Sequence, residues 1–328
     1  MPAHLPACLV YSPFTRKQLE VDVNSERLCR EGVVVSVVNA MVLWRATRAY
    51  SLPASVVPVV LGTALATRGY GELGSGHFNV STFCVVLLGA VVAHFGANVL
   101  NDYFDFVKGV DTRQEHGSGV LTSGQMTPSQ ALWFGILLFA AAGVCALVLL
   151  AGRASIVVPL ALVGIGCAVF YPALLKKYGL GDLLIILPFG FGLTLGAYGV
   201  QTPELSSRQW LFVAFYSIPV CLLVDAILHA NNLRDAADDH AADVRTLATV
   251  LGPRRGRNLQ VLLLYGPLLF VVVGVATRLL PLWSLATFAS LPLLVGAYRS
   301  GSVPGTAQTH LVFGLLYALS FLPRPVFI

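Results

Sequence analysis

Residues 98–111 read NVLNDYFDFVKGVD and end a long apolar run. A second polar string, NNLRDAADD at residues 231–239, ends another apolar run. In the first string Asn101 and Asp105 are four residues apart. The second string repeats that spacing at Asn231, Asp235 and Asp239. Because side chains four residues apart share one face of an α-helix, each run is predicted to end in a column of oxygen-bearing side chains.

The composition excludes an ordinary soluble protein. Of the 328 residues, 56% are hydrophobic and 11% are charged, against about 25% charged residues in a typical soluble domain. A helix needs about 20 mostly apolar residues to cross a bilayer. The apolar runs predict an all-α, polytopic membrane protein with nine transmembrane helices, at about 51–67, 82–101, 131–151, 155–175, 182–200, 210–230, 258–277, 280–297 and 309–325.

Basic residues predict the orientation of the chain. With nine spans, the N-terminal segment shares a side with the connections after spans 2, 4, 6 and 8, and that side holds 16 of the 21 Lys and Arg residues. Loops rich in Lys and Arg stay in the cytoplasm, so this side is predicted to be cytoplasmic. Residues 33–44 are too short to span and predict an interfacial helix. We therefore expect an N-terminal cytoplasmic segment at 1–45 and a transmembrane domain at 46–328.

The acidic residues are concentrated at the ends of two spans. Of the 16 Asp and Glu residues, four lie within 101–115 and four within 231–243. These clusters follow the second and sixth spans, which are an even number of crossings apart, so both emerge on the predicted cytoplasmic side. The basic residues are not interleaved with aromatic residues on one polar face, and this gives no support for a nucleic-acid partner.

Two facing columns of carboxylate and amide oxygens favour Mg²⁺, which takes hard oxygen ligands and completes its shell with water and substrate phosphates. The basic residues Lys108, Arg234, Lys176 and Lys177 are predicted on the same side, which favours a site for a metal and a diphosphate. Two alternatives are ordinary solvated loops and a cation-coupled transporter. Transporter carboxylates usually lie near the bilayer midplane, whereas all of these acids except Asp225 lie at membrane ends.

Both strings resemble the two Asp-rich motifs of the UbiA superfamily of intramembrane prenyltransferases. The resemblance extends to WRATRAYSLPASVVPVVLG at 44–62, which is similar to the family's first span, and to LKKYGLGDLL at 175–184. Lys108 to Asp111 and GVLTSGQMTPSQ at 119–130 resemble the branch that prenylates 1,4-dihydroxy-2-naphthoate for menaquinone, together with its vertebrate vitamin-K relatives. The resemblance implies a single bundle of nine helices around a central cavity that is open to cytoplasm and lipid.

The resemblance also implies the roles of individual residues. The implied Mg²⁺ ligands are Asn101, Asp105, Asp111, Asp235 and Asp239. Asp111 departs from the usual motif because it follows Asp105 by six residues rather than four, and Asp238 is an alternative to Asp239. The implied diphosphate-binding residues are Lys108, Arg234, Lys177 (with Lys176 as an alternative), Arg48, Asn98, Asn231 and Asn232.

Asp225, Asp105 and Asp235 are the candidate catalytic residues. Asp225 differs from the others because it lies within a predicted span, where an ionisable side chain is a functional candidate. It is predicted to orient or deprotonate the acceptor hydroxyl, with His229 as a partner; a helix-packing hydrogen bond is the alternative. His94 and His310 are interpreted as core or cavity-lining residues.

The implied reaction transfers a polyprenyl group from polyprenyl diphosphate to an aromatic acceptor, with 1,4-dihydroxy-2-naphthoate as the first expectation. The alternatives are 4-hydroxybenzoate, homogentisate or a tetrapyrrole as acceptor, the transporter above, and a lipid-sensing scaffold of the same fold. The expected setting is the lipid bilayer, which is the inner membrane if the protein is bacterial. No obligatory protein partner is inferred.

Overall fold

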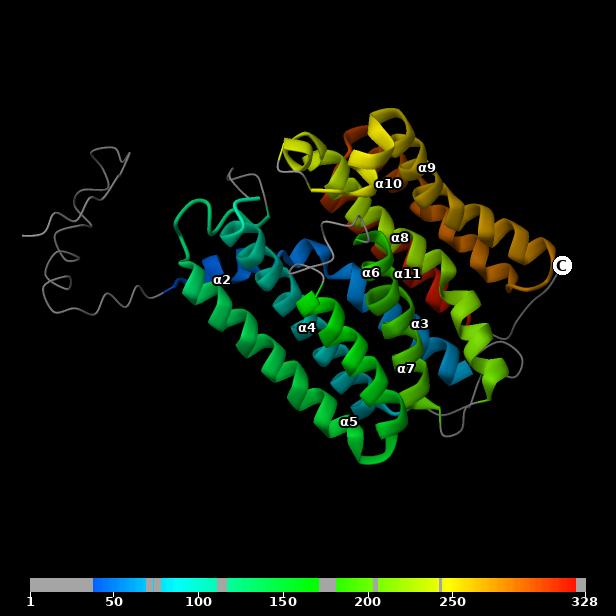
Figure 1. Ribbon diagram of the computed structural model, residues 1–328. Coiled ribbons are helices and arrows are strands. Elements are labelled where there is room, and N and C mark those ends of the chain that lie inside the picture. The colour runs from blue at the N-terminus through cyan, green and yellow to red at the C-terminus, as the bar shows by residue number, and fades with distance from the viewer. Residues whose placement is uncertain are drawn as a thin grey trace, which may run out of the picture. The chain divides into compact units, whose positions relative to one another are not determined.

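Apolar helices form the whole regular structure of the described residues, as the sequence predicts (Figure 1). The computed structural model describes residues 38–68, 73, 78–110, 117–170, 181–202, 206–241 and 244–322. The elements are α2 (Ala40–Ala46), η1 (Ala49–Ser51), α3 (Pro53–Arg68), α4 (Val80–Val107), α5 (Pro128–Phe170), α6 (Gly181–Ile185), η5 (Ile186–Gly192), α7 (Leu193–Gln201), α8 (Ser207–Ala241), α9 (Leu247–Ala276), η6 (Leu282–Ser290), α10 (Leu291–Ser300) and α11 (Val303–Leu319).

Five helices of the described residues are long and apolar enough to cross a membrane. They are Ala49–Thr67, Val80–Val107, Pro128–Arg153, Ser207–Ala241 and Leu247–Ala276, and they coincide with five predicted spans. The other four predicted spans fall on the part of α5 that follows Arg153, on α6 to α7, on η6 with α10, and on α11. A single bundle of nine transmembrane helices therefore stays a prediction.

Local backbone chemistry explains the turn between two predicted spans and an irregularity within a third. Helix α5 has non-helical torsion angles at Ala151, Gly152 and Arg153, and Gly152 has a φ of 151°, which only glycine adopts readily. Figure 1 shows the chain turning back at this break, so that α5 forms two arms. Between α6 and α7 the chain widens into the π-helical segment η5, which contains Pro188. Proline lacks the backbone N–H of a regular helix, and π-type turns often mark functional sites.

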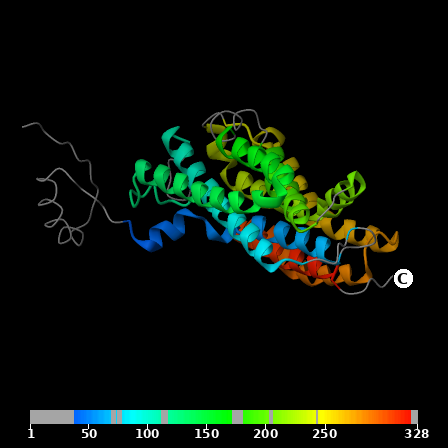
Figure 2. The same cartoon turned by 90° about the horizontal axis from the view of Figure 1, so that it is seen from below.

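The apolar core joins the first and last parts of the described chain. Its buried residues come mainly from α3, α7, α8, α9, α10 and α11, and α3 lies beside α11 in both views (Figures 1 and 2). The two helices approach closely because Gly314 has no side chain: a Cβ there would lie 2.1 Å from Val57 Cγ1. Gly62 likewise allows α3 to approach α7 closely, because a Cβ at this position would lie 2.2 Å from the Thr194 carbonyl oxygen.

Residues 40–328 form one compact unit. Its first helix, α2, overlaps the C-terminal part of the predicted interfacial segment 33–44, whose first five residues lie outside the described part of the chain. The predicted division between 1–45 and 46–328 stays a prediction.

Candidate active site

One large cavity lies between the helices that carry the two polar strings. Its volume is about 480 Å³, and α3, α4, both arms of α5, α6 to α7 and α8 line it. On α4 the lining residues extend from Val85 to Asp105. At a rise of 1.5 Å per residue this is a length of about 30 Å, which equals the hydrocarbon thickness of a typical bilayer. The cavity therefore extends over a length comparable to that thickness.

The two predicted columns line the same end of this cavity. Helix α4 contributes Asn101 and Asp105. Helix α8 contributes five residues, namely Asn231, Asn232, Asp235, Asp238 and Asp239. Asp105 and Asp239 are buried, at 4% and 7% exposure, and buried carboxylates require compensating charge or hydrogen bonds. The structure thus brings together residues that lie 130 positions apart in the sequence.

Both columns have the same internal hydrogen bond. Asn101 Nδ2 donates to Asp105 Oδ2 at 2.9 Å, and Asn231 Nδ2 donates to Asp235 Oδ2 at 3.1 Å. Each bond joins residues four positions apart on one helix face, as the spacing predicts. On α8 the Arg234 guanidinium also contacts Asp235. The amide of each asparagine orients the carboxylate one turn later.

Arg48 and Asn98, both predicted to bind diphosphate, line the cavity but also have partners within the protein. Arg48 forms an ion pair with Asp102, a residue to which sequence reasoning gave no role. Asp102 Oδ2 also accepts a hydrogen bond from the Ser118 backbone N–H at 2.9 Å. Asn98 Nδ2 donates to the Thr47 carbonyl oxygen at 2.8 Å and to Ser51 Oγ at 3.1 Å. These contacts fix the chain before α3 against α4.

Other predicted residues lie outside the cavity lining or outside the described residues. Lys108 is exposed at the C-terminal cap of α4, and Arg234 is exposed beside Asp235. Both are close in sequence to lining residues at the polar end. Asp111, Lys176 and Lys177 lie outside the residues that the structure describes.

The predicted catalytic role of Asp225 stays a prediction. Asp225 is buried at 4% exposure, but its neighbours Val224, Ile227 and Leu228 are the α8 residues that line the cavity at that depth. The proposed partner His229 is also directed elsewhere, because its Nε2 lies 2.9 Å from the Gly256 carbonyl oxygen on α9. The His229 contact joins α8 to α9.

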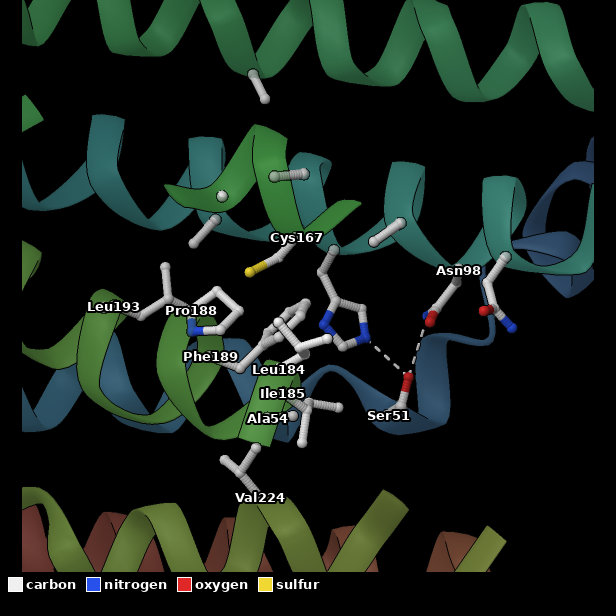
Figure 3. A pocket seen from close by; sticks show the side chains of 18 of the residues that line it. Ser51, Ala54, Asn98, Cys167, Leu184, Ile185, Pro188, Phe189, Leu193 and Val224 are labelled. Atoms are coloured by element: carbon white, nitrogen blue, oxygen red, sulfur yellow. Dashed lines mark hydrogen bonds between the residues drawn. The ribbon is translucent and has the colours of Figure 1, made fainter. Parts of the chain in front are cut away.

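His94, which the sequence predicts as a core or cavity-lining residue, lines the cavity. Its Nε2 lies 2.8 Å from Ser51 Oγ, and its Nδ1 lies 2.8 Å from Ser55 Oγ. Figure 3 shows Ser51 at the cavity wall, with its hydrogen bond to Asn98. Because Ser51 donates its only hydroxyl proton to the Arg48 carbonyl oxygen, it must accept from His94. The Nε2 atom therefore carries the proton, and Nδ1 accepts from Ser55. The Phe189 ring packs edge-on at 5.4 Å between centroids.

The polar end of the cavity fits Mg²⁺ in the company of a phosphate ligand. Its side chains offer carboxylate and amide oxygens, the ligands that Mg²⁺ prefers. Among the described residues, no three His, Cys, Asp or Glu side chains come together in a group that could hold a metal ion by themselves. Mg²⁺ commonly binds through one or two carboxylates and completes its shell with water and substrate phosphates. This donor set therefore fits an ion that is shared with a diphosphate.

Comparison with solved structures shows which fold this is. An apo UbiA homologue from Aeropyrum pernix K1 superposes with a TM-score of 0.58 and 14% identity over 83% of this chain and 95% of that chain. A UbiA homologue from Archaeoglobus fulgidus, solved with GPP and Mg²⁺, superposes with a TM-score of 0.57 and 11% identity over 86% of this chain and 99% of that chain. These neighbours share the fold of a membrane-embedded helical family.

Sequence relatives extend the likeness beyond the fold. The homologue of UbiA prenyltransferase domain-containing protein 1 from Drosophila melanogaster is 34% identical over 287 residues, which are 84% of this chain and 77% of that protein. The human protein of that name is 32% identical over 290 residues, which are 85% of this chain and 83% of that protein. The family model described as the UbiA prenyltransferase family matches residues 55–319. The chain belongs to the UbiA prenyltransferase family.

Proposed function

We propose that this protein uses Mg²⁺ to transfer a prenyl group from a prenyl diphosphate to an aromatic acceptor within the membrane. The observation that supports this most directly is the division of one cavity into a polar end and an apolar remainder. The polar end has oxygen columns from α4 and α8, and the remainder is lined mainly by apolar side chains, which on α4 extend from Val85 to Ala97 over about 18 Å. A prenyl diphosphate has the same two parts. The Archaeoglobus homologues solved with DMAPP or GPP and Mg²⁺ support this assignment.

The proposed metal ligands are the column residues Asn101, Asp105, Asp235 and Asp239, with Asn231 and Asn232 beside them. When bound there, Mg²⁺ would neutralise charge that develops on the leaving diphosphate. The protein's own contribution is positional: the hydrogen bonds from Asn101 to Asp105 and from Asn231 to Asp235 orient both carboxylates before substrate arrives. Lys108 and Arg234, with Lys177 and Arg48, are proposed to contact the diphosphate oxygens.

The apolar lining performs the second task. When the allylic C–O bond breaks, the prenyl carbon becomes electron-poor, and water would capture it. Small and apolar side chains such as Ala90, Ala93, Ala97 and Phe189 line the cavity beside the polar end. They exclude water from the reacting carbon, so that an electron-rich aromatic ring attacks it instead.

For the acceptor we propose 1,4-dihydroxy-2-naphthoate, in which alkylation accompanies loss of CO₂. The support is the resemblance of Lys108 to Asp111 and of residues 119–130 to the menaquinone branch. The competing acceptors are 4-hydroxybenzoate, homogentisate and tetrapyrroles. Purified protein in liposomes, supplied with Mg²⁺, geranylgeranyl diphosphate and each acceptor separately, would distinguish them by the mass of the product.

We place both polar columns on the cytoplasmic side of the membrane. The support is the excess of Lys and Arg in the connections on that side, 16 of the 21 in the chain. Cysteine labelling from outside sealed vesicles, at single cysteines introduced at Gly109 and at Arg278, tests this orientation. The proposal requires opposite accessibility at the two positions.

The decisive experiment for the proposed function is substitution of one carboxylate on each helix. Asp105→Asn and Asp235→Asn keep the side-chain shape but remove the charge, and each is expected to lower turnover about 10²- to 10³-fold, the usual cost of losing one preorganised electrostatic group. Asp238→Asn and Asp239→Asn identify which of the two neighbouring acids is required. Gel filtration and thermal unfolding verify that each variant is folded. Full activity in both Asp105→Asn and Asp235→Asn would overturn the proposal.

A further inference from the structure

The Arg234 side chain covers the oxygen atoms of the α8 column. Arg234 Nε donates to Asp235 Oδ1 at 2.7 Å, and Arg234 Nη2 donates to Asp235 Oδ2 at 2.7 Å. The same Nη2 donates to Asn231 Oδ1 at 2.9 Å. The planar guanidinium suits this paired geometry, which a lysine ammonium cannot reproduce. Arg234 therefore contacts two of the four α8 residues that we propose at the metal site, namely the ligand Asp235 and its neighbour Asn231.

Few positions on Asp235 remain for another cation. Its Oδ2 accepts from both Arg234 and Asn231, and its Oδ1 accepts from Arg234. A carboxylate has about four lone-pair positions, so about one is left. A divalent ion that binds this column closely must share or displace the Arg234 contacts, because the ion and the guanidinium need the same lone pairs.

The position of Arg234 allows such a displacement. Its side chain is 39% exposed, whereas that of Asp235 is 20% exposed. The guanidinium thus reaches the carboxylate from the solvent side, and Arg234 is not among the residues that line the cavity. If the Arg234 side chain turned toward a ligand at the cavity mouth, no buried charge would be exposed.

Building on the proposed function, we infer that Arg234 is the resident cation of the α8 column before substrate binds, and that it moves from Asp235 to the diphosphate when the donor arrives. The exchange keeps the column neutralised in both states. It also makes binding of the divalent ion and of the diphosphate cooperative, because each favours the state in which Arg234 has left Asp235. Such coupling is reciprocal between the two ligands.

The test is a binding measurement on full-length protein in detergent, with Mn²⁺ as the probe ion and electron paramagnetic resonance to count free Mn²⁺. Affinity is measured with and without inorganic pyrophosphate, for the natural protein and for Arg234→Gln. Arg255→Gln is the matched control, because it removes the same charge from an exposed arginine on α9 that does not line the cavity. Arg234→Lys retains the charge without the paired geometry.

We expect Arg234→Gln to bind Mn²⁺ about tenfold more tightly than the natural protein when pyrophosphate is absent, a difference of about 1.4 kcal/mol. Pyrophosphate should then enhance Mn²⁺ binding less than it does in the natural protein. Arg234→Lys should lie between the two, and Arg255→Gln should match the natural protein. The tighter Mn²⁺ binding of Arg234→Gln should disappear in the double variant Arg234→Gln/Asp235→Asn. That loss would locate the added affinity at the α8 column.

Two results would overturn the inference in different ways. If the natural protein binds Mn²⁺ with pyrophosphate but Arg234→Gln shows unchanged or weaker binding alone, the exchange is wrong and the proposed function stands. If neither protein binds Mn²⁺ even with pyrophosphate, the metal–diphosphate site itself is wrong.

Discussion

Replacing Asp102 should destabilise this protein more than replacing an acid in any exposed ion pair. The side chains of Arg48 and Asp102 are 12% and 6% exposed, so water screens their attraction only slightly. Removing one partner of a buried pair leaves an uncompensated charge and costs about 3–5 kcal/mol, whereas breaking an exposed pair costs about 0–1 kcal/mol. We therefore expect Asp102→Asn to lower the free energy of unfolding by about 3 kcal/mol.

Two further variants separate the contribution of the Arg48–Asp102 ion pair from that of the hydrogen bond between Asp102 and the Ser118 N–H. Asp102→Ala also removes the acceptor of the Ser118 N–H and should cost about 1 kcal/mol more, because a buried donor is left without a partner. The double variant Arg48→Met/Asp102→Leu should recover much of the loss, since apolar replacements of buried pairs are often neutral or stabilising.

The assay is reversible unfolding in mixed detergent micelles, followed by tryptophan fluorescence. A loss below about 1 kcal/mol for Asp102→Asn, the value typical of an exposed pair, would refute the reasoning from burial. So would a double variant that is no more stable than Asp102→Asn.

Three other predictions follow from features described above. Gly62→Ala should lower the unfolding midpoint because its Cβ would lie 2.2 Å from a backbone oxygen, at a cost of about 1–3 kcal/mol; Gly143→Ala, with nothing within 4 Å, is the control and should match the natural protein. His94→Phe removes the hydrogen bond to Ser51 Oγ, which lines the cavity, and should raise the KM for donor, measured by initial rates; an unchanged KM would contradict a role of this hydrogen bond in donor binding. Chelation with EDTA should abolish prenyl transfer without unfolding the protein, because no three metal-ligating acids, histidines or cysteines cluster among the described residues; circular dichroism before and after chelation checks this, and loss of helix would contradict it.

The sequence predicted the parts of the fold that depend on local periodicity. Long apolar runs predicted the five long helices, and the spacing of four residues predicted which side chains share a helix face. The common side of the two columns followed from counting membrane crossings. These inferences succeed because a lipid environment requires helices whose backbone groups are satisfied internally.

The remaining features depend on contacts between distant segments. The partner of Asp102 lies 54 positions earlier in the sequence, at Arg48, and no local pattern indicates it. Asp225 and Asn232 are seven residues apart and therefore near one helix face, yet only Asn232 lines the cavity. Helical spacing gives the direction of a side chain but does not show which neighbour covers it at each depth.

The length of the cavity affects how the enzyme's kinetics must be measured. Its lining extends about 30 Å along α4, and only 6% of the apolar window in Pro128–Arg153 is buried within the protein. Each methylene group of a long hydrocarbon tail favours the lipid over water by about 0.8 kcal/mol. We therefore expect the proposed donor to reach this cavity by lateral diffusion in the membrane and not from the aqueous phase. Saturation should therefore follow the mole fraction of donor among the lipids. An apparent KM given in molar units should rise in proportion when more lipid is added, while the maximal turnover stays constant.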